Sequence, residues 1–197
     1  MKQLLIATRN NHKFEEMVSL LFSSGFELKN LNDFPNTSTT IEDQPTLEGN
    51  ALKKAKEAYN ATGILSLADD TGLECYYLEL QPGIYSARFA GENASKEENN
   101  KKLLTLLKGV PPRRRNARFR TVIAIVGKGI EKIVSGKIEG EIVETPRGNY
   151  GFGYDSLFIP QGYKKTFAEM TTEEKNQCSH RARAINSVLE ILKNFNE

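Results

Sequence analysis

Residues 3–21 of the chain, QLLIATRNNHKFEEMVSLL, join an apolar run, a polar turn and an amphipathic segment. Gln3 to Thr8 has the composition of a short buried strand. The apolar residues that follow are spaced i, i+3, i+4 and i+7, so they share one face of a helix. They are Phe14, Met17, Val18 and Leu21. A strand, a loop and a helix in this order are typical of an α/β protein.

The rest of the chain extends this pattern into a mixed sheet. Further strands are predicted at 64–68, 73–80, 119–126, 130–143 and 157–159. A second helix is predicted from the N-cap Thr46 to about Ala61. A third is predicted after the capping box of Ser95 and Glu98, and a last one at the end of the chain, after the capping box of Thr171 and Glu174. The turn at 127–129 is so short that it permits only antiparallel pairing, so the sheet cannot be purely parallel.

Composition favours an ordinary soluble protein. The 197 residues are 39% hydrophobic and 26% charged, which is sufficient for one compact domain spanning 1–197. The apolar run from Leu4 to Ala7 is too short for a signal segment or membrane span, so we expect a cytoplasmic protein with no membrane partner. Cys75 and Cys178 lack metal-site or disulfide patterns and are expected to be reduced thiols.

The net charge of +2 is too small to indicate a nucleic-acid partner. One basic cluster enters the predicted strand at 119–126. It consists of Arg113, Arg114, Arg115, Arg118 and Arg120. We interpret it as a solvated loop, which is the usual setting of a charge run.

Thr8, Asn10 and Lys13 lie where the first strand ends and the first helix begins. Ligands often bind at this edge of an α/β sheet. Helix N–H groups, a hydroxyl, an amide and a lysine could together hold a phosphate there. Asn and Thr are also ordinary helix-entry residues, so the segment alone leaves both interpretations open.

Asp69 and Asp70 follow an apolar strand directly and are followed by Thr71 and Gly72. Adjacent carboxylates repel and raise a pKa unless a cation neutralises them, so Mg²⁺ is a natural partner. Glu42 could complete a metal site. The alternative is a turn rich in Asp that happens to contain two acids. In either case we expect the tetrad to interrupt the strand.

Two later segments could recognise a base. The run from Gly148 to Asp155 offers glycines for close approach and aromatic rings for stacking, although the rings could instead pack in the core. No helix follows it, which disfavours a dinucleotide site. Lys175 and the residues Ser179 to Arg181, at the start of the last helix, could hold an anion or a carbonyl. The alternative there is a serine cap followed by exposed side chains.

Taken in order, these segments resemble the inosine triphosphate pyrophosphatase family over nearly the whole chain. The matching pieces are Thr8-x-Asn10-x-x-Lys13, Thr46-Leu47-Glu48-Gly49-Asn50-Ala51 with Lys53 or Lys54 after it, Ala68-Asp69-Asp70-Thr71-Gly72-Leu73, Pro82-Gly83-Ile84-Tyr85-Ser86-Ala87-Arg88, Gly151-Phe152-Gly153-Tyr154-Asp155, and Glu174-Lys175 with Ser179-His180-Arg181. The resemblance implies an elongated mixed sheet flanked by helices, two lobes with a nucleotide-binding cleft between them, and a homodimer.

The resemblance also implies roles for individual residues. Thr8, Asn10, Lys13 and Lys175 would hold phosphates, and Asp70 would be the catalytic base. Glu42 and Asp70 would bind Mg²⁺. The base and sugar would meet Phe152 and Asp155, with Thr71, Gly153 and Tyr154 also in the substrate site, and His180 and Arg181 would contact the purine edge. The family often has Pro where this chain has Ser156, which affects the loop that places Asp155.

The expected reaction is hydrolysis of non-standard purine nucleoside triphosphates, those of inosine, deoxyinosine and xanthosine, to monophosphate and pyrophosphate. Such an enzyme keeps these bases out of DNA and RNA. Two alternatives stay open: a pyrophosphatase for other modified nucleotides and a non-catalytic nucleotide-binding module. The paired Asp69 and Asp70 weigh against a mere binding module, because carboxylates beside a triphosphate weaken binding unless metal chemistry requires them.

Overall fold

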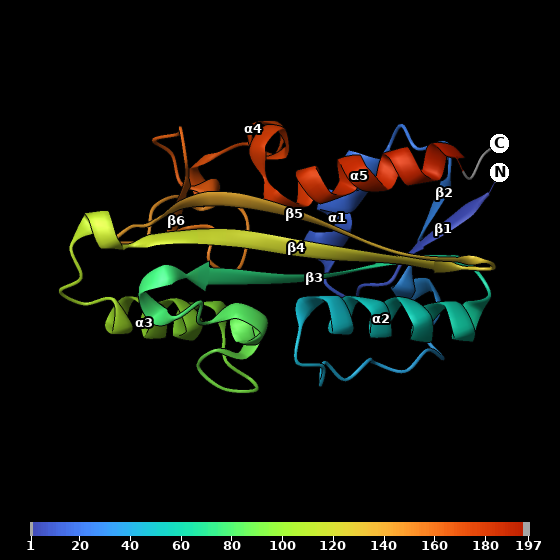
Figure 1. The fold of residues 1–197 in the computed structure, drawn as a ribbon, viewed down its shortest axis with the longest axis horizontal. Helices are drawn as coiled ribbons and strands as arrows, with labels where there is room; N and C mark the ends of the chain where they lie inside the picture. The colour runs from blue at the N-terminus through green and yellow to red at the C-terminus, as the bar shows by residue number, and fades with distance from the viewer. Residues whose placement is uncertain (1, 195–197) are drawn as a thin grey trace. The chain divides into compact units, whose positions relative to one another are not determined.

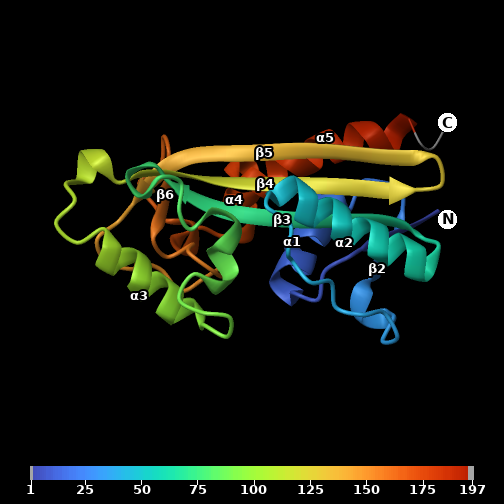
Figure 2. The ribbon, with the colours of Figure 1, turned by 60° about the horizontal axis from the view of Figure 1, so that its bottom comes forward.

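The computed structural model describes residues 2–194, which form an α/β fold (Figures 1 and 2). The strands are β1 (Gln3–Ile6), β2 (Glu27–Asn30), β3 (Leu65–Cys75), β4 (Asn116–Gly127), β5 (Ile130–Ile142) and β6 (Phe158–Pro160). The α-helices are α1 (Asn11–Leu21), α2 (Leu47–Thr62), α3 (Lys96–Leu106), α4 (Thr172–Cys178) and α5 (His180–Asn194). The predicted α/β class is confirmed.

The six strands form one sheet in the order β2-β1-β3-β4-β5-β6. β1 lies parallel to both β2 and β3, whereas β5 and β6 are antiparallel. Only Lys128 and Gly129 separate β4 from β5, and a connection of two residues can join only antiparallel neighbours. The predicted mixed sheet is therefore confirmed, with its parallel part at the N-terminal end of the chain.

The chain divides into two compact units. Unit 1 comprises the described parts of Met1–Asp70, Thr121–Gly136 and Arg181–Glu197, and unit 2 comprises Thr71–Arg120 and Lys137–His180. Each unit has its own hydrophobic core. Buried residues of α1, β4 and α5, including Met17, Ile123 and Ile185, form the core of unit 1. Buried residues of α3, β4 and β6, including Leu103, Phe119 and Phe158, form that of unit 2.

The caps predicted from the sequence hold the helices in place. The Thr46 hydroxyl accepts from Gly49 N at the start of α2, and Gly63 ends this helix with a left-handed φ of 68°. Ser95 and Glu98 form the expected capping box of α3. The capping box of Thr171 and Glu174 opens a separate short helix, α4, because Ser179 adopts an extended conformation and divides α4 from α5.

The predicted interruption of the strand at Asp69–Gly72 is wrong. β3 runs without a break from Leu65 to Cys75, and both aspartates are buried within it. The strand continues because the ammonium and guanidinium groups of neighbouring elements neutralise the two carboxylates, as described below. The predicted strand also ends earlier than expected, since residues 76–78 form a 3-10 turn.

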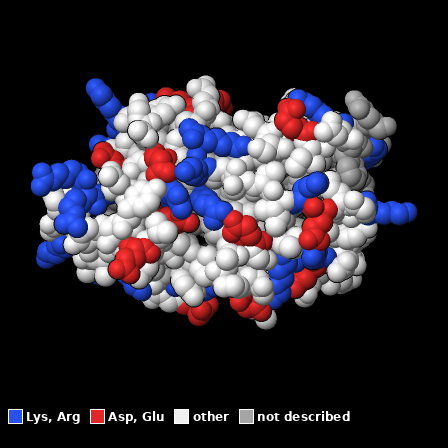
Figure 3. All heavy atoms as spheres, viewed as in Figure 1, with Lys and Arg blue, Asp and Glu red and all other residues white. Residues whose placement is uncertain are grey.

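The interpretation of the arginine cluster as a solvated loop is wrong for three of its five members, since Arg118 and Arg120 are partly buried residues of β4 and Arg115 is buried. Arg113 and Arg114 are exposed, but Arg115 is buried and donates to three backbone carbonyls, those of Leu107, Ile142 and Val143, at 2.7–2.8 Å. Arg115 therefore links the C-terminal end of α3 to the C-terminal end of β5. On the face drawn in Figure 3, basic and acidic side chains both appear, in keeping with the small net charge. None of the helices within residues 2–194 has the length and apolar composition needed to cross a bilayer.

Candidate active site

The turn between β1 and α1 is ordered by its own side chains. The Thr8 hydroxyl accepts from Asn10 N at 3.2 Å, and Asn10 Oδ1 accepts from Lys13 N at 3.2 Å, which makes Asn10 the N-cap of α1. The Lys13 ammonium lies 3.1 Å from the Asp69 carboxylate of β3. The structure thus brings the first predicted phosphate-binding segment into contact with the paired aspartates, all within unit 1.

Asp69 is a buried carboxylate held between cations. Only 2% of its surface is exposed, and it pairs with Lys13 and, at 3.2 Å, with Nη2 of Arg181. Burial alone would disfavour its ionised form, but the charges of Lys13, Arg181 and Lys54 outweigh burial and lower the pKa of Asp69. Asp69 is therefore ionised, and cationic side chains occupy its oxygens.

Asp70 has a different environment from its neighbour. Its Oδ1 lies 3.1 Å from Lys54 Nζ, and the same ammonium lies 2.9 Å from Glu42 Oε1. Burial, together with the charge of Glu42, raises the pKa of Asp70 despite the opposing charges of Lys54 and Lys13. A carboxylate with a raised pKa is better suited to accept a proton than one with a depressed pKa.

Glu42 and Asp70 share one cation position. The ammonium of Lys54 bridges their carboxylates, and burial works against its charge while Asp70, Asp69 and Glu42 raise its pKa. No cluster of three or more acidic, His or Cys side chains suited to a metal occurs within residues 2–194. Mg²⁺, however, is commonly held by one or two carboxylates together with water and substrate phosphates. Such an ion would take the position between Glu42 and Asp70 that the Lys54 ammonium holds, whereas Asp69 pairs with Lys13 and Arg181.

Arg181 is the most deeply buried charged residue of unit 1. Its side chain is 1% exposed, and its guanidinium forms ion pairs with Glu16 of α1 and with Asp69. The alternative in which a serine cap precedes exposed side chains is therefore wrong here. The sequence predicted that Arg181 contacts a purine edge, and the ion pairs tie this guanidinium to the paired aspartates as well.

In unit 2, the loop from Gly151 to Asp155 folds around a single carboxylate. Asp155 Oδ2 accepts from Phe152 N at 2.9 Å and from Lys175 Nζ at 2.7 Å. Gly151 has a φ of 71°, and a Cβ added there would lie 2.2 Å from the same oxygen, so only glycine fits. Asp155 thus fixes the loop and neutralises Lys175.

The other aromatic and basic side chains of unit 2 surround this loop. Lys175 is buried, and its Nζ lies 5.0 Å from the centre of the Phe152 ring, a cation–π distance. His180 is also buried and stacks on Phe119 with the ring centroids 4.6 Å apart. Tyr154 lies in the core, where its hydroxyl donates to Ser86 O at 2.9 Å. Phe152 is therefore the partly exposed ring of the loop.

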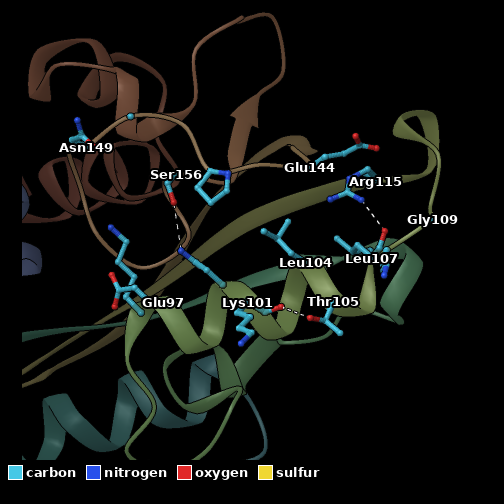
Figure 4. A pocket seen from close by; sticks show the side chains of 15 residues that line it. Glu97, Lys101, Leu104, Thr105, Leu107, Gly109, Arg115, Glu144, Asn149 and Ser156 are labelled. Atoms are coloured by element: carbon cyan, nitrogen blue, oxygen red, sulfur yellow. Dashed lines mark hydrogen bonds between the residues drawn. The ribbon is translucent and has the colours of Figure 1, made fainter.

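A pocket of about 770 Å³ in unit 2 adjoins this loop, because Asn149 and Ser156 on either side of the loop line it (Figure 4). Its walls come from α3 and the loop around Glu144, Pro146 and Asn149. At one side Asn100 Nδ2 donates to Ser156 Oγ at 3.4 Å, and at the other Arg115 donates to Leu107 O at 2.8 Å. Of the run from Gly148 to Asp155 only Gly148 and Asn149 line this pocket, and none of the residues to which the resemblance gives a role lines it.

The sequence interpretation assigned no role to three residues of the unit 1 group, although Asn50, and Lys53 or Lys54, stand in one of the segments that carry the resemblance. Lys54 bridges Glu42 and Asp70, Glu16 holds Arg181, and Asn50 donates from Nδ2 to Asp70 Oδ2 at 3.2 Å. A signal existed for Asn50, because it falls between Leu47 and Ala51 on the apolar face of α2, where a polar side chain needs a buried partner. The resemblance pointed to Lys53 or Lys54 without distinguishing them, and Glu16 lies in a segment with many charges and carried no such signal.

Fold and site together define an α/β protein that has a buried charged centre at the paired aspartates in unit 1 and a glycine-aromatic loop in unit 2. A sequence model of the Ham1 family matches residues 4–191. The chain belongs to the Ham1 family.

Relatives of known name are similar over almost their whole length. The chain is 47% identical over 183 residues to a dITP/XTP pyrophosphatase of Thermoanaerobacter pseudethanolicus, covering 93% of this chain and 92% of that one. It is 42% identical over 193 residues to a dITP/XTP pyrophosphatase of Bacillus subtilis, covering 98% of each. Among solved structures, the Ham1 protein of Staphylococcus aureus has a TM-score of 0.87 at 36% identity, covering 98% of this chain and 99% of that one.

Proposed function

We propose that this chain hydrolyses non-standard purine nucleoside triphosphates, those of inosine, deoxyinosine and xanthosine, to the monophosphate and pyrophosphate. Membership of the Ham1 family and the names of its relatives support the activity. One observation in the chain itself carries the proposal. Of two adjacent buried carboxylates, Asp69 is neutralised by Lys13 and Arg181, whereas Asp70 has a raised pKa and shares a cation with Glu42.

In this proposal Asp70 is the catalytic base. It accepts a proton from the water that attacks the α-phosphorus, and pyrophosphate is the leaving group. Its raised pKa brings proton affinity closer to neutral pH, which favours proton transfer in the transition state. A cysteine nucleophile is not needed, and burial raises the pKa of Cys75 to about 12, which keeps this thiol protonated.

The proposed cofactor is Mg²⁺, held by Glu42 and Asp70. When bound, Mg²⁺ would neutralise phosphate charge during the displacement. The contact of one ammonium with both carboxylates supports a cation position between them. Thr8, Asn10 and Lys13 would bind phosphate oxygens, since the cap of α1 places a hydroxyl, an amide and an ammonium at one helix N-terminus.

Several side chains are proposed to recognise the base and sugar, on the basis of the family resemblance. Phe152 supplies a stacking face, and Gly153 and Asp155 present loop groups near it, while Tyr154 acts by anchoring the loop to Ser86. Lys175 would contact a phosphate, and His180 would contact the purine edge. Thr71, which follows Asp70 in the chain, would contact the substrate through its hydroxyl. Arg181 is always a donor, so a 6-oxo purine is preferred over adenine, whose amino group also donates.

The chain is proposed to work as a single domain spanning 1–197, in the cytoplasm and as a homodimer, without nucleic acid or membrane partners. By removing non-standard triphosphates, it would keep their bases out of DNA and RNA.

The test is kcat/KM for a panel of inosine, deoxyinosine, xanthosine, guanosine and adenosine triphosphates, measured with Mg²⁺. The proposal predicts that inosine and xanthosine triphosphates are preferred over adenosine triphosphate, by up to about 10⁴-fold for a site built on a matching hydrogen bond. Equal values for inosine and adenosine triphosphates would contradict the assignment of base recognition. Binding without turnover of any member of the panel would identify a binding module instead.

A further inference from the structure

We propose that Asn50 is a positioning residue that holds the catalytic carboxylate of Asp70 and the loop carrying Glu42 in one fixed arrangement. The inference rests on the proposed function, because it assigns Asn50 a role only if Asp70 and Glu42 act on substrate and metal. In this role Asn50 contacts neither the substrate nor the metal, and it acts on the reaction through Asp70 and Glu42.

The two ends of the Asn50 amide have different partners. The side chain is fully buried, its Oδ1 accepts from Gln44 N at 3.0 Å, and its Nδ2 donates to Asp70 Oδ2 at 3.2 Å. A backbone N–H can only donate, so Gln44 N fixes which end of the amide is the oxygen. The amino end therefore faces the carboxylate of Asp70, where it makes a charge-assisted hydrogen bond.

The contact with Gln44 ties the loop before α2 to the helix. Gly49 lies beside Asn50, and a Cβ added to Gly49 would come within 2.8 Å of Gln44 Cβ. The absence of a side chain at Gly49 thus lets the loop approach α2 closely enough for Gln44 N to reach Asn50. Glu42 is only two residues from Gln44, so the same bond restrains the segment that carries Glu42.

Asp70 is consequently held at both carboxylate oxygens by side chains of one helix. Asn50 donates to Oδ2 and Lys54 to Oδ1, and both donors belong to α2. Two bonds from a rigid helix fix the plane of the carboxylate, which leaves little freedom to rotate about the Cβ–Cγ bond. A base must be aimed at its water to within a fraction of an ångström, so loss of one bond lowers the rate more than it weakens substrate binding.

Asn99 provides a matched control for this role. It is buried to a similar extent, its Nδ2 donates to Ala87 O at 3.1 Å, and its Oδ1 accepts from Ala90 N at 2.7 Å. Like Asn50, it bridges two segments by one donated and one accepted bond. Unlike Asn50, it gives both bonds to the backbone, so replacing it tests the structural cost of losing a buried amide.

The experiment compares Asn50→Asp, Asn50→Ala and Asn99→Asp with the parent enzyme, using inosine triphosphate and a series of Mg²⁺ concentrations. Asn50→Asp keeps the acceptor for Gln44 N but replaces the donor to Asp70 with an acidic oxygen, and Asn50→Ala removes both bonds without adding a charge. We expect each Asn50 variant to lower kcat by about 10²-fold while KM for the nucleotide stays within about 3-fold. Asn50→Ala should also raise the Mg²⁺ concentration needed for half-maximal rate by about 10-fold, because the Glu42 loop is released.

Thermal unfolding of all variants separates positioning from folding. Asn99→Asp should keep the parent kcat within about 2-fold even if its melting temperature falls. Parent-like kcat in both Asn50 variants would overturn the inference, while the proposed function would stand as long as the parent hydrolyses inosine triphosphate to pyrophosphate. Failure of both Asn50 variants to fold where Asn99→Asp folds would make Asn50 a structural residue and would also overturn it. An inactive parent would instead refute the proposed function.

Discussion

Asp69 and Asp70 are consecutive residues of β3, and their environments shift their pKa values in opposite directions. Burial would raise both, but Lys13 and Arg181 lower the pKa of Asp69, whereas the pKa of Asp70 stays raised beside Glu42. Adjacent residues of a strand point to opposite faces of the sheet, which explains how two neighbours can meet different partners. The pair therefore divides into one carboxylate that cations hold ionised and one with a raised pKa, which the proposed function takes as the base.

Asp69→Asn should destabilise the protein far more than Asp70→Asn does. Removing the charge of Asp69 leaves Lys13 and the fully buried Arg181 without this partner, and breaking a buried ion pair costs about 3–5 kcal/mol of unfolding free energy. The pKa of Asp70 is raised, so its ionised form does not stabilise the fold. In the absence of metal, the unfolding free energy of Asp70→Asn should therefore equal or exceed that of the parent. Urea denaturation at pH 7 measures the unfolding free energies of the two variants and of the parent.

The pH dependence of these stabilities has a defined sign. The folded-state pKa of Asp69 is below its unfolded value of about 4, so its contribution is present above pH 4 and is lost as the pH falls through the folded pKa. The stability difference between parent and Asp69→Asn should therefore shrink as the solution is acidified below about pH 4. A difference that is constant with pH would contradict the assigned ion pairs.

Asp70→Asn should lower kcat by at least about 10²-fold while nucleotide binding stays measurable. The change removes a base and a negative charge without changing the size of the side chain. Asp43→Asn is the control, because Asp43 is an exposed acid of the same loop as Glu42 and its carboxylate contacts Lys53 and Gln44. Turnover near the parent rate in Asp70→Asn would exclude Asp70 as the base.

Glu42→Gln should raise the Mg²⁺ concentration for half-maximal rate by at least about 10-fold, since it removes one of the two carboxylates that share a cation position. Activity of the parent should vanish in excess chelator. Asp43→Asn should leave the Mg²⁺ requirement near that of the parent. An unchanged requirement in Glu42→Gln would assign the metal to other groups.

Much of this fold could be predicted from the sequence, because local signals and tertiary packing agree. Thr46, Ser95 and Thr171 each begin a helix as predicted, and the two-residue turn between β4 and β5 sets the antiparallel part of the sheet. The failures occur where distant charges change the local preference. Asp69 and Asp70 continue a strand because α1, α2 and α5 bring cations to them.

The candidate site shows the same limit. Motif residues such as Lys13 and Asp155 could be identified from local pattern alone. Their partners could not, because the Glu16–Arg181 pair joins residues 165 positions apart and the Asn50–Asp70 bond joins α2 to β3. The prediction for Arg115 was wrong for a related reason. Nothing in its basic run indicates that three carbonyls of unit 2 accept hydrogen bonds from its guanidinium.

Phe152→Leu should weaken binding of the substrate by about 5- to 100-fold in KM, because base stacking on an aromatic ring contributes about 1–3 kcal/mol. The neighbouring aromatic Tyr150 is two-thirds exposed and serves as the control in Tyr150→Leu. Steady-state kinetics with inosine triphosphate compare the two. Equal effects of both changes on KM would remove Phe152 from base recognition.

The products of inosine triphosphate hydrolysis test the central claim most directly. A water and a base placed at the α-phosphorus cut once, between the α- and β-phosphates. Initial-rate analysis of the reaction with Mg²⁺ should therefore find inosine monophosphate and pyrophosphate in equal amounts from the earliest times. Inosine diphosphate and orthophosphate as first products would contradict the account.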